Sequence, residues 1–184
     1  MKLSETPLLG AFEIEIEEIE DERGFFARTW DKNEFIKRNL DSEFVQSNIS
    51  FNKKKGTIRG MHYQSKPYEE TKIIRCTKGA IYDVIIDLRP NSLTFKEWFA
   101  TELTENNHKI LYIPKGFAHG YQTMEDNSEV SYQVSQYYNA NYSEGVRWND
   151  KTFEIKWPLE VTSISQKDLT SSFFSKLSKE VKTI

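Results

Sequence analysis

The chain has 184 residues, of which 38% are hydrophobic and 14% aromatic, and carries a formal net charge of −3. This length suits one well-packed domain, because two half-sized domains would each have a small core, so we treat residues 1–184 as a single domain. A pI near 5.7 argues against nucleic acid as a partner, and no apolar run approaches the roughly 20 residues that cross a bilayer, so we also expect no membrane partner. The single cysteine, Cys76, fits a reduced, cytoplasmic compartment and a packing role.

Apolar and polar residues alternate along most of the chain, which is typical of half-buried β-strands. The first such strand is expected at residues 12–16, where apolar residues alternate with glutamates. A turn at 21–24 then leads into a second strand at 25–30. Asp31 is placed to cap a short helix over 34–38, because aspartate accepts hydrogen bonds from the first free N–H groups of a helix.

The strand pattern continues beyond that helix. Strands at 72–77 and 80–88 meet at Lys78 and Gly79, which favours a hairpin. Further strands are expected at 44–49, 59–64, 95–103, 109–113, 120–124 and 130–138. Many short strands separated by Gly, Pro, Asn and Asp predict an all-β sandwich or barrel. Residues 173–181 have helical periodicity and predict a terminal helix.

Two of the three histidines lie in compact β segments. His62 belongs to the strand at 59–64, and His119 ends a Pro-x-Gly-x-x-His bend, whereas His108 lies between polar residues. An antiparallel barrel with a histidine on an inner strand and another at such a bend resembles the cupin fold. We therefore expect a cupin-type jelly roll, a double-stranded antiparallel β-barrel, with short peripheral helices and one site that contains both histidines.

A metal site is an alternative interpretation of these histidines. Metal-binding cupins usually present His-x-His, and here Gln64 stands in the place of the second histidine. Glutamine is a poor ligand for a transition metal beside an imidazole. Two of the three residues Glu69, Glu70 and His119 could still complete a three-ligand set with His62. Gln64 therefore disfavours the metal interpretation. We expect neither a metal nor an organic cofactor.

Eight short motifs follow one another through nearly the whole chain. They occupy residues 21–26, 46–48, 56–64, 70–73, 78–84, 113–120, 145–148 and 165–168. In this order they resemble one family, the dTDP-4-dehydrorhamnose 3,5-epimerases of deoxysugar and cell-surface polysaccharide biosynthesis. The resemblance implies an isomerase that acts on a nucleotide-linked 4-keto-6-deoxyhexose and epimerises it at C3, C5 or both. It also implies a homodimer whose subunits donate nucleotide contacts to each other.

The resemblance assigns roles to individual residues. His62 matches the general base, Asp168 its carboxylate partner, Tyr132 the acid on the opposite face of the sugar, and Lys72 the cation at the C4 oxygen. The matching substrate-binding positions are Arg23, Phe26, Arg28, Gln46, Asn48, Arg59, Gln64, His119, Tyr138 and Lys167. Taken singly, His62 and Tyr132 also fit hydrogen-bonded core positions, and Lys72 fits a solvent-facing strand position.

Two departures from the family bear on the substrate. Many of its members have a glutamate where this chain has Arg28, and a lysine where it has Gln133. A carboxylate accepts the imide N–H of thymine, whereas a guanidinium only donates and therefore suits the acceptor edge of cytosine. If position 28 faces the base, CDP is thus an alternative to dTDP. The alternative functions are a sugar-nucleotide 3,4-ketoisomerase, a metal-dependent cupin enzyme and a non-catalytic sugar-nucleotide binding module.

The strand at 59–64 presents one geometric difficulty. Strict alternation places Arg59 and His62 on opposite faces, although both are assigned to the same site. They share it only if Gly60 permits a bulge or if the long arginine wraps around the mouth of the barrel.

Overall fold

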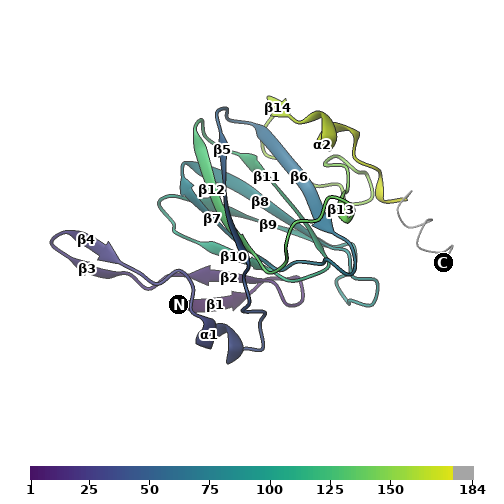
Figure 1. Cartoon of the computed structure of the whole chain (residues 1–184). Coiled ribbons are helices and arrows are strands. Elements are labelled where there is room, and N and C mark those ends of the chain that lie inside the picture. The colour runs from purple at the N-terminus through teal and green to yellow at the C-terminus, as the bar shows by residue number, and fades with distance from the viewer. Residues whose placement is uncertain (176–184) are drawn as a thin grey trace.

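Antiparallel strand pairing dominates the structure, a computed structural model that describes residues 1–175 (Figure 1). The first sheet has six strands in the spatial order β1 (Lys2–Glu5), β2 (Phe12–Glu15), β10 (Ile110–Ile113), β7 (Lys72–Lys78), β12 (Ser128–Val134) and β5 (Gln46–Asn52). The second sheet has the order β13 (Ser143–Gly145), β6 (Thr57–Gln64), β11 (Phe117–Thr123), β8 (Ala80–Asp87) and β9 (Trp98–Thr104), with β14 (Ser163–Ile164) pairing with β6 in parallel. The two sheets form the expected all-β, cupin-like fold.

Buried apolar side chains of residues 1–175 form three clusters. The largest lies between the two sheets and includes Ile74, Ile85, Leu111 and Cys76, whose thiol pKa is raised to about 11 by burial. A second cluster forms where residues 146–175 cover the outer face of the second sheet. In the third, α1 (Lys32–Ile36) packs Phe35 against the outer face of the first sheet. None of the helices within residues 1–175 has the length and hydrophobicity to span a membrane.

The short helix predicted after Asp31 is confirmed, although it spans Lys32–Ile36 rather than residues 34–38. Asp31 is the N-cap of α1, and its carboxylate accepts hydrogen bonds from the backbone N–H groups of Asn33 and Glu34. The second helix, α2 (Gln166–Thr170), is capped in the same way by Ser165, whose hydroxyl accepts from the N–H of Asp168. The terminal helix predicted at 173–181 lies mainly outside the described residues.

The predicted hairpin at Lys78 and Gly79 is wrong. β7 pairs with β10 and β12 in the first sheet, whereas β8 pairs with β11 and β9 in the second. Gly79, at a φ of 71°, therefore marks a corner at which the chain crosses from one sheet to the other. Local alternation predicts both strands correctly but does not tell which neighbours they pair with.

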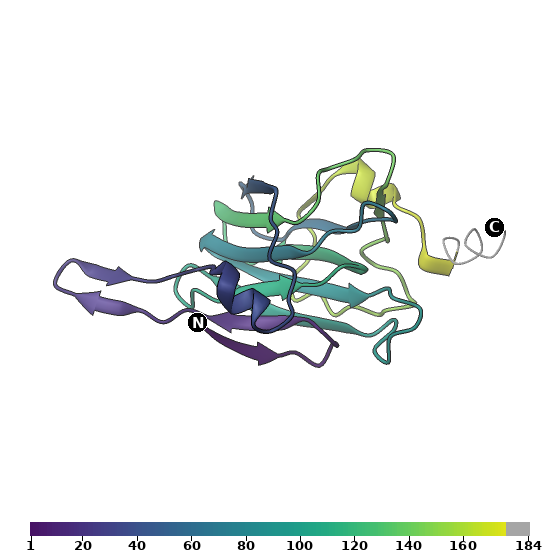
Figure 2. The same ribbon diagram turned by 60° about the horizontal axis from the view of Figure 1, so that its bottom comes forward.

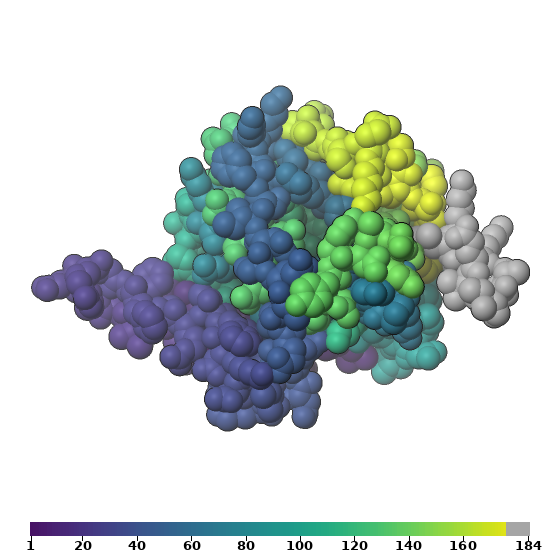
Figure 3. Space-filling model, in the orientation of Figure 1, coloured from purple at the N-terminus to yellow at the C-terminus, as the bar shows by residue number. Residues whose placement is uncertain are grey.

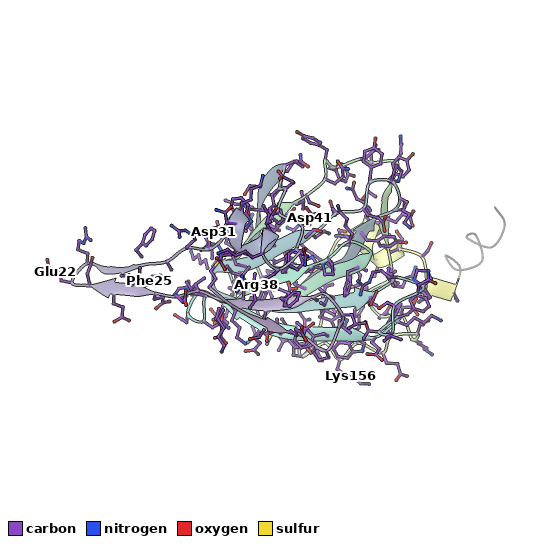
Figure 4. All side chains as sticks on the ribbon, turned by 90° about the horizontal axis from the view of Figure 1, so that it is seen from below. Glu22, Phe25, Asp31, Arg38, Asp41 and Lys156 are labelled. Atoms are coloured by element: carbon purple, nitrogen blue, oxygen red, sulfur yellow. The ribbon has the colours of Figure 1, made fainter. Side chains whose placement is uncertain are left out.

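A two-stranded arm projects from the body of the molecule. β3 (Ile19–Asp21) pairs only with β4 (Gly24–Phe26), so the strand predicted at 25–30 ends early. Figures 1 and 2 show the arm extending away from both sheets, and Figure 3 shows it standing clear of the surface. Ile19 and Phe26 are 67% and 65% exposed on it, and Figure 4 shows Glu22 and Phe25 at its outer end.

A bulge in β6 resolves the difficulty with Arg59 and His62. His62 lies opposite His119 on β11, and Arg59 lies opposite Tyr121, so three steps along β6 face only two along β11. Gly60, at a φ of 128°, absorbs the additional residue. A Cβ atom on Gly60 would lie only 2.5 Å from the Cα atom of Gly120. The bulge therefore depends on two glycines in contact, and it turns Arg59 and His62 to the same side.

Candidate active site

A cavity of about 190 Å³ opens between the two sheets, and we call it the central cavity. It is lined by side chains from both sheets: Arg59, His62, His119 and Tyr121 from the second, and Ser50, Lys72, Ile74, Val130 and Tyr132 from the first. A neighbouring space of about 350 Å³, the outer cavity, lies beside β6, β14 and α2 and includes Lys167, Ser163 and Ser165 in its lining. Arg59 and His62 line both cavities and so stand between them.

His62 and Asp168 form a hydrogen-bonded pair at this boundary. The Nε2 atom of His62 lies 2.6 Å from Oδ1 of Asp168, and the other carboxylate oxygen accepts the N–H of Gly60 at 3.2 Å. Ser165 fixes the start of α2 and thereby the position of Asp168, which is only 3% exposed. The carboxylate is thus held on both oxygens and orients the imidazole.

The surroundings of Asp168 favour its charged form. Burial alone would raise its pKa, but the hydrogen bond and charge of His62, together with the N–H of Gly60, outweigh burial and bring the pKa below the ordinary carboxyl value. Asp168 is therefore ionised at neutral pH. An ionised partner stabilises the imidazolium that forms when His62 accepts a proton.

Lys72 and Tyr132 approach the central cavity from the first sheet, on adjacent strands. Ile74 pairs with Tyr132 and Val134 with Lys72 in the register of β7 and β12, so the two side chains are diagonal neighbours on one face. Lys72 is 8% exposed, and its Nζ atom pairs with Oε1 of Glu70 at 3.1 Å. Burial, followed by the charge of Glu70, raises the pKa of Tyr132, so its hydroxyl is protonated at neutral pH.

A second histidine–carboxylate pair lies deeper in the second sheet. Nε2 of His119 lies 3.0 and 2.9 Å from the two carboxylate oxygens of Asp83, which is fully buried. Burial raises the pKa of Asp83, while His119 and Lys72 oppose that rise only in part. Asp83 was not among the predicted site residues. An aspartate among the apolar residues of β8 was the available signal, because buried carboxylates require a partner.

The polar groups around the cavity continue along β5. The Nε atom of Arg59 donates to Oδ1 of Asn52 at 2.7 Å. Alternation places Gln46, Asn48 and Ser50 in one row with Asn52, and the amide oxygen of Gln46 accepts the N–H of the 63% exposed Tyr138. These residues form a polar track that leads from the central cavity to an exposed aromatic ring.

Several predicted site residues lie apart from this group. Arg23, Phe26 and Arg28 lie on or beside the arm and line neither cavity; Arg23 pairs with Asp21, and Arg28 with Asp31. Gln64 is buried, and its amide bonds to other protein groups rather than lining a cavity. Lys167, in contrast, lines the outer cavity and donates to Ser143 at 3.3 Å.

The alternative metal ligand set is not assembled. Glu70 pairs with Lys72 and accepts a hydrogen bond from Gln64, while His62 and His119 each face an aspartate. Within residues 1–175, no group of three or more His, Cys, Asp or Glu side chains is arranged to hold a metal ion.

A family model and individual relatives both match this chain, and all carry the name of the family that the motifs resemble. The family model described as dTDP-4-dehydrorhamnose 3,5-epimerase matches residues 5–176. The enzyme of that name from Methanothermobacter thermautotrophicus is 40% identical over 167 residues, which are 89% of each chain. The enzyme from Shigella flexneri is 38% identical over 157 residues, or 84% of this chain and 85% of its own.

Solved structures of enzymes from this family have the same fold as this chain. The dTDP-4-dehydrorhamnose 3,5-epimerase of Bacillus anthracis, with TDP and PPi bound, superposes with a TM-score of 0.91 at 42% identity, over 94% of this chain and 99% of that one. The dTDP-6-deoxy-D-glucose-3,5-epimerase of Legionella pneumophila, in complex with dTDP-4-keto-L-rhamnose, has a TM-score of 0.91 at 30% identity, over 98% and 96%. This is the family of the epimerase interpretation and not that of a ketoisomerase, a metal-dependent cupin enzyme or a binding module. The chain belongs to the dTDP-4-dehydrorhamnose 3,5-epimerase family of isomerases.

Proposed function

We propose that this chain epimerises a nucleotide-linked 4-keto-6-deoxyhexose at C3, C5 or both, and that His62, Asp168, Tyr132 and Lys72 carry the reaction. The observation that supports this assignment most strongly is the central cavity, where His62 comes from one sheet and Lys72 and Tyr132 from the other. A sugar ring bound between the sheets would meet a base on one face and an acid on the other.

The chemistry requires that arrangement. C3 and C5 both flank the C4 ketone, so loss of either proton gives an enolate whose charge lies on the C4 oxygen. Inversion then needs a proton to return from the opposite face. His62 removes the first proton and becomes imidazolium beside the ionised Asp168, and Tyr132 delivers the second proton from its hydroxyl. A base and an acid each contribute roughly 10²- to 10⁴-fold.

Lys72 supplies the third requirement, which is stabilisation of the enolate. Its ammonium group is nearly buried, and a donor in such a low-dielectric site acts more strongly on a developing oxyanion than one in water. Removal of one such donor typically costs about 3 kcal/mol of transition-state stabilisation. Each step is a proton transfer between named side chains and the sugar, so the proposed reaction uses neither a metal nor an organic cofactor.

The nucleotide is proposed to lie along the polar track of β5. Arg59 would engage the diphosphate, because a guanidinium bonds two phosphate oxygens at once, and Lys167 would add a second cation from α2. His119 borders the sugar, while Gln46, Asn48 and Tyr138 extend toward the base. Gln64 would support the nucleotide site indirectly, because its amide group bonds the backbone of Tyr137 and Asn139 on either side of Tyr138.

We also propose a homodimer in which each arm reaches the site of the other subunit. Arg23 and Phe26 belong to the arm and Arg28 follows it, and none of the three lines the central cavity of its own subunit. The arm also exposes Ile19, Phe25 and Phe26 to solvent. An exposed apolar patch of this kind is typical of an interaction surface. The partner's arm would complete the nucleotide site near Tyr138.

The reaction is tested by solvent exchange. In D₂O, the wild type should place deuterium at C3 or C5 of dTDP-4-keto-6-deoxyglucose, which mass spectrometry and NMR detect. His62→Ala should slow this exchange by about 10²-fold or more, because the base is lost. Lys156→Ala removes an exposed side chain that lies outside both cavities and should keep the wild-type rate. A wild type that exchanges neither proton would refute the proposed function.

The shared site is tested by mixing two inactive variants. His62→Ala lacks the base but has an intact arm, and the double variant Arg23→Ala/Phe26→Ala has the base but a defective arm. After the two are unfolded and refolded together, each mixed dimer contains one complete site, so about a quarter of wild-type activity should return. Restoration should not occur if each site is built from one subunit. Sedimentation of the wild type as a monomer would likewise contradict the proposal.

Which nucleobase the enzyme prefers remains a prediction, and it depends on whether Arg28 faces the base of the nucleotide. Within its own subunit, the Arg28 guanidinium is exposed and lies 3.6 Å from the carboxylate of Asp31, so it is available to a partner. Calorimetric titration with dTDP, UDP, CDP and GDP measures the preference directly. If Arg28 reads the base, CDP should bind best, and Arg28→Glu should shift the preference toward dTDP. A clear preference of the wild type for dTDP would remove Arg28 as a determinant of cytosine.

A further inference from the structure

Glu70 lies at the centre of a buried polar network beside the central cavity. Its Oε1 atom pairs with Nζ of Lys72 at 3.1 Å, and its Oε2 atom accepts from Nε2 of Gln64 at 3.0 Å. The Glu70 and Lys72 side chains are only 12% and 10% exposed. A carboxylate held on both oxygens in this way has little freedom to move.

Gln64 is fixed in turn by the backbone. Its amide nitrogen also lies 3.0 and 3.2 Å from the carbonyl oxygens of Tyr68 and Tyr137, so its two N–H groups are shared among three acceptors, and its amide oxygen accepts the N–H of Asn139. The position of Glu70 is therefore set by β6 and by the segment that follows β12, rather than by Lys72 itself. Neutralising the charge of Lys72 requires only the ion pair, whereas here a second residue, Gln64, also fixes the direction of the Glu70 carboxylate.

We propose that Glu70 is a positioning residue for the epimerisation: held by Gln64, it aims the Lys72 ammonium at the C4 oxygen of the sugar. The inference rests on the proposed function, because it assigns Glu70 to the same reaction. From the sequence, Glu70 was considered only as a possible metal ligand, and a positioning role was not predicted.

The geometric part of the proposal follows from the flexibility of lysine. A lysine side chain has four rotatable bonds and an ammonium with three N–H donors. One donor satisfied by Glu70 fixes the direction of the head group and leaves two for an oxyanion. Positioning of this kind raises the rate because less ordering remains for the reaction step.

The electrostatic part concerns Tyr132, whose pKa is raised first by burial and then by the negative charge of Glu70, while Arg59 opposes the rise. A tyrosine that donates a proton must still hold it, and a nearby carboxylate favours that state. The other titratable or charged groups that face this cavity are His62 and Arg59 of β6, Lys72 of β7, and His119 and Tyr121 of β11, with Asp168 and Asp83 behind the two histidines.

Glu70→Gln separates these roles from simple packing. Glutamine keeps the size of the side chain and one acceptor oxygen but removes the charge. We expect kcat for deuterium exchange to fall about tenfold to a hundredfold, with KM within about threefold, because a transition-state contact is weakened. The basic limb of the kcat pH profile should move to lower pH, because Tyr132 loses its proton more readily.

Three further variants complete the test. Glu69→Gln removes the neighbouring carboxylate, whose Oε1 atom lies 3.8 Å from the position that a Cβ atom on Gly116 would take, and it should leave the rate and the pH profile unchanged. Glu70→Asp retains the charge but shortens the side chain, so kcat should fall while the basic limb stays. In a Lys72→Met background, Glu70→Gln should reduce kcat little further, because its effect on the enolate acts through Lys72.

The outcomes are distinguishable. A folded Glu70→Gln enzyme with the wild-type rate and basic limb would overturn this inference alone, as long as the wild type exchanges. A wild type that shows no exchange would overturn the proposed function and this inference with it. If Glu70→Gln does not fold, the Glu70→Asp enzyme and the Lys72→Met pair still decide between positioning and packing.

Discussion

The close contact between β6 and β11 at Gly60 and Gly120 is the constraint on which the site depends. A Cβ atom on Gly60 would lie 2.5 Å from Cα of Gly120, and one on Gly120 would lie 2.7 Å from the carbonyl oxygen of Arg59. The additional residue that β6 accommodates there turns Arg59 and His62 toward one cavity. The same bulge frees the N–H of Gly60 from the strand ladder and directs it at Asp168. One local irregularity thus aligns the proposed base, His62, the carboxylate of Asp168 that orients it, and Arg59, the cation proposed for the diphosphate.

Around that bulge, the buried charges are arranged in compensated pairs. Asp168 faces His62, Asp83 faces His119, and Glu70 faces Lys72. A buried carboxylate without a partner costs several kcal/mol, so such pairing is expected on stability grounds alone. The residues proposed to react are also divided between the two sheets. Both histidines belong to the second sheet, whereas Lys72 and Tyr132 belong to the first. A substrate held between the sheets would therefore meet the proposed proton acceptor on one side and the proposed proton donor on the other.

Sequence reasoning reached the all-β fold, the Asp31 cap and, as one of two alternatives, the bulge at Gly60, because each depends on neighbouring residues. It failed where distant partners decide the outcome. Alternation predicted β7 and β8 but placed them in a hairpin, since the pattern does not reveal that each pairs in a different sheet. Asp168 could be joined to His62 only through the family resemblance, as 106 residues separate them. Asp83 and Glu70 were not recognised as partners of His119 and Lys72, because those pairings depend on strand register and on side-chain direction across the cavity.

Thermal unfolding of Gly60→Ala beside Gly10→Ala is the most direct measurement of the central constraint. Both glycines have positive φ, at 128° and 84°, but a Cβ atom on Gly10 would meet nothing closer than 3.7 Å. Strain from positive φ therefore acts in both variants, whereas the clash with Gly120 acts only in one. The account predicts that Gly60→Ala lowers Tm by about 10 °C and Gly10→Ala by about 3 °C, given roughly 2 to 4 °C per kcal/mol for a domain of this size. Equal, small shifts in the two variants would contradict the close contact between β6 and β11 and the site geometry built on it.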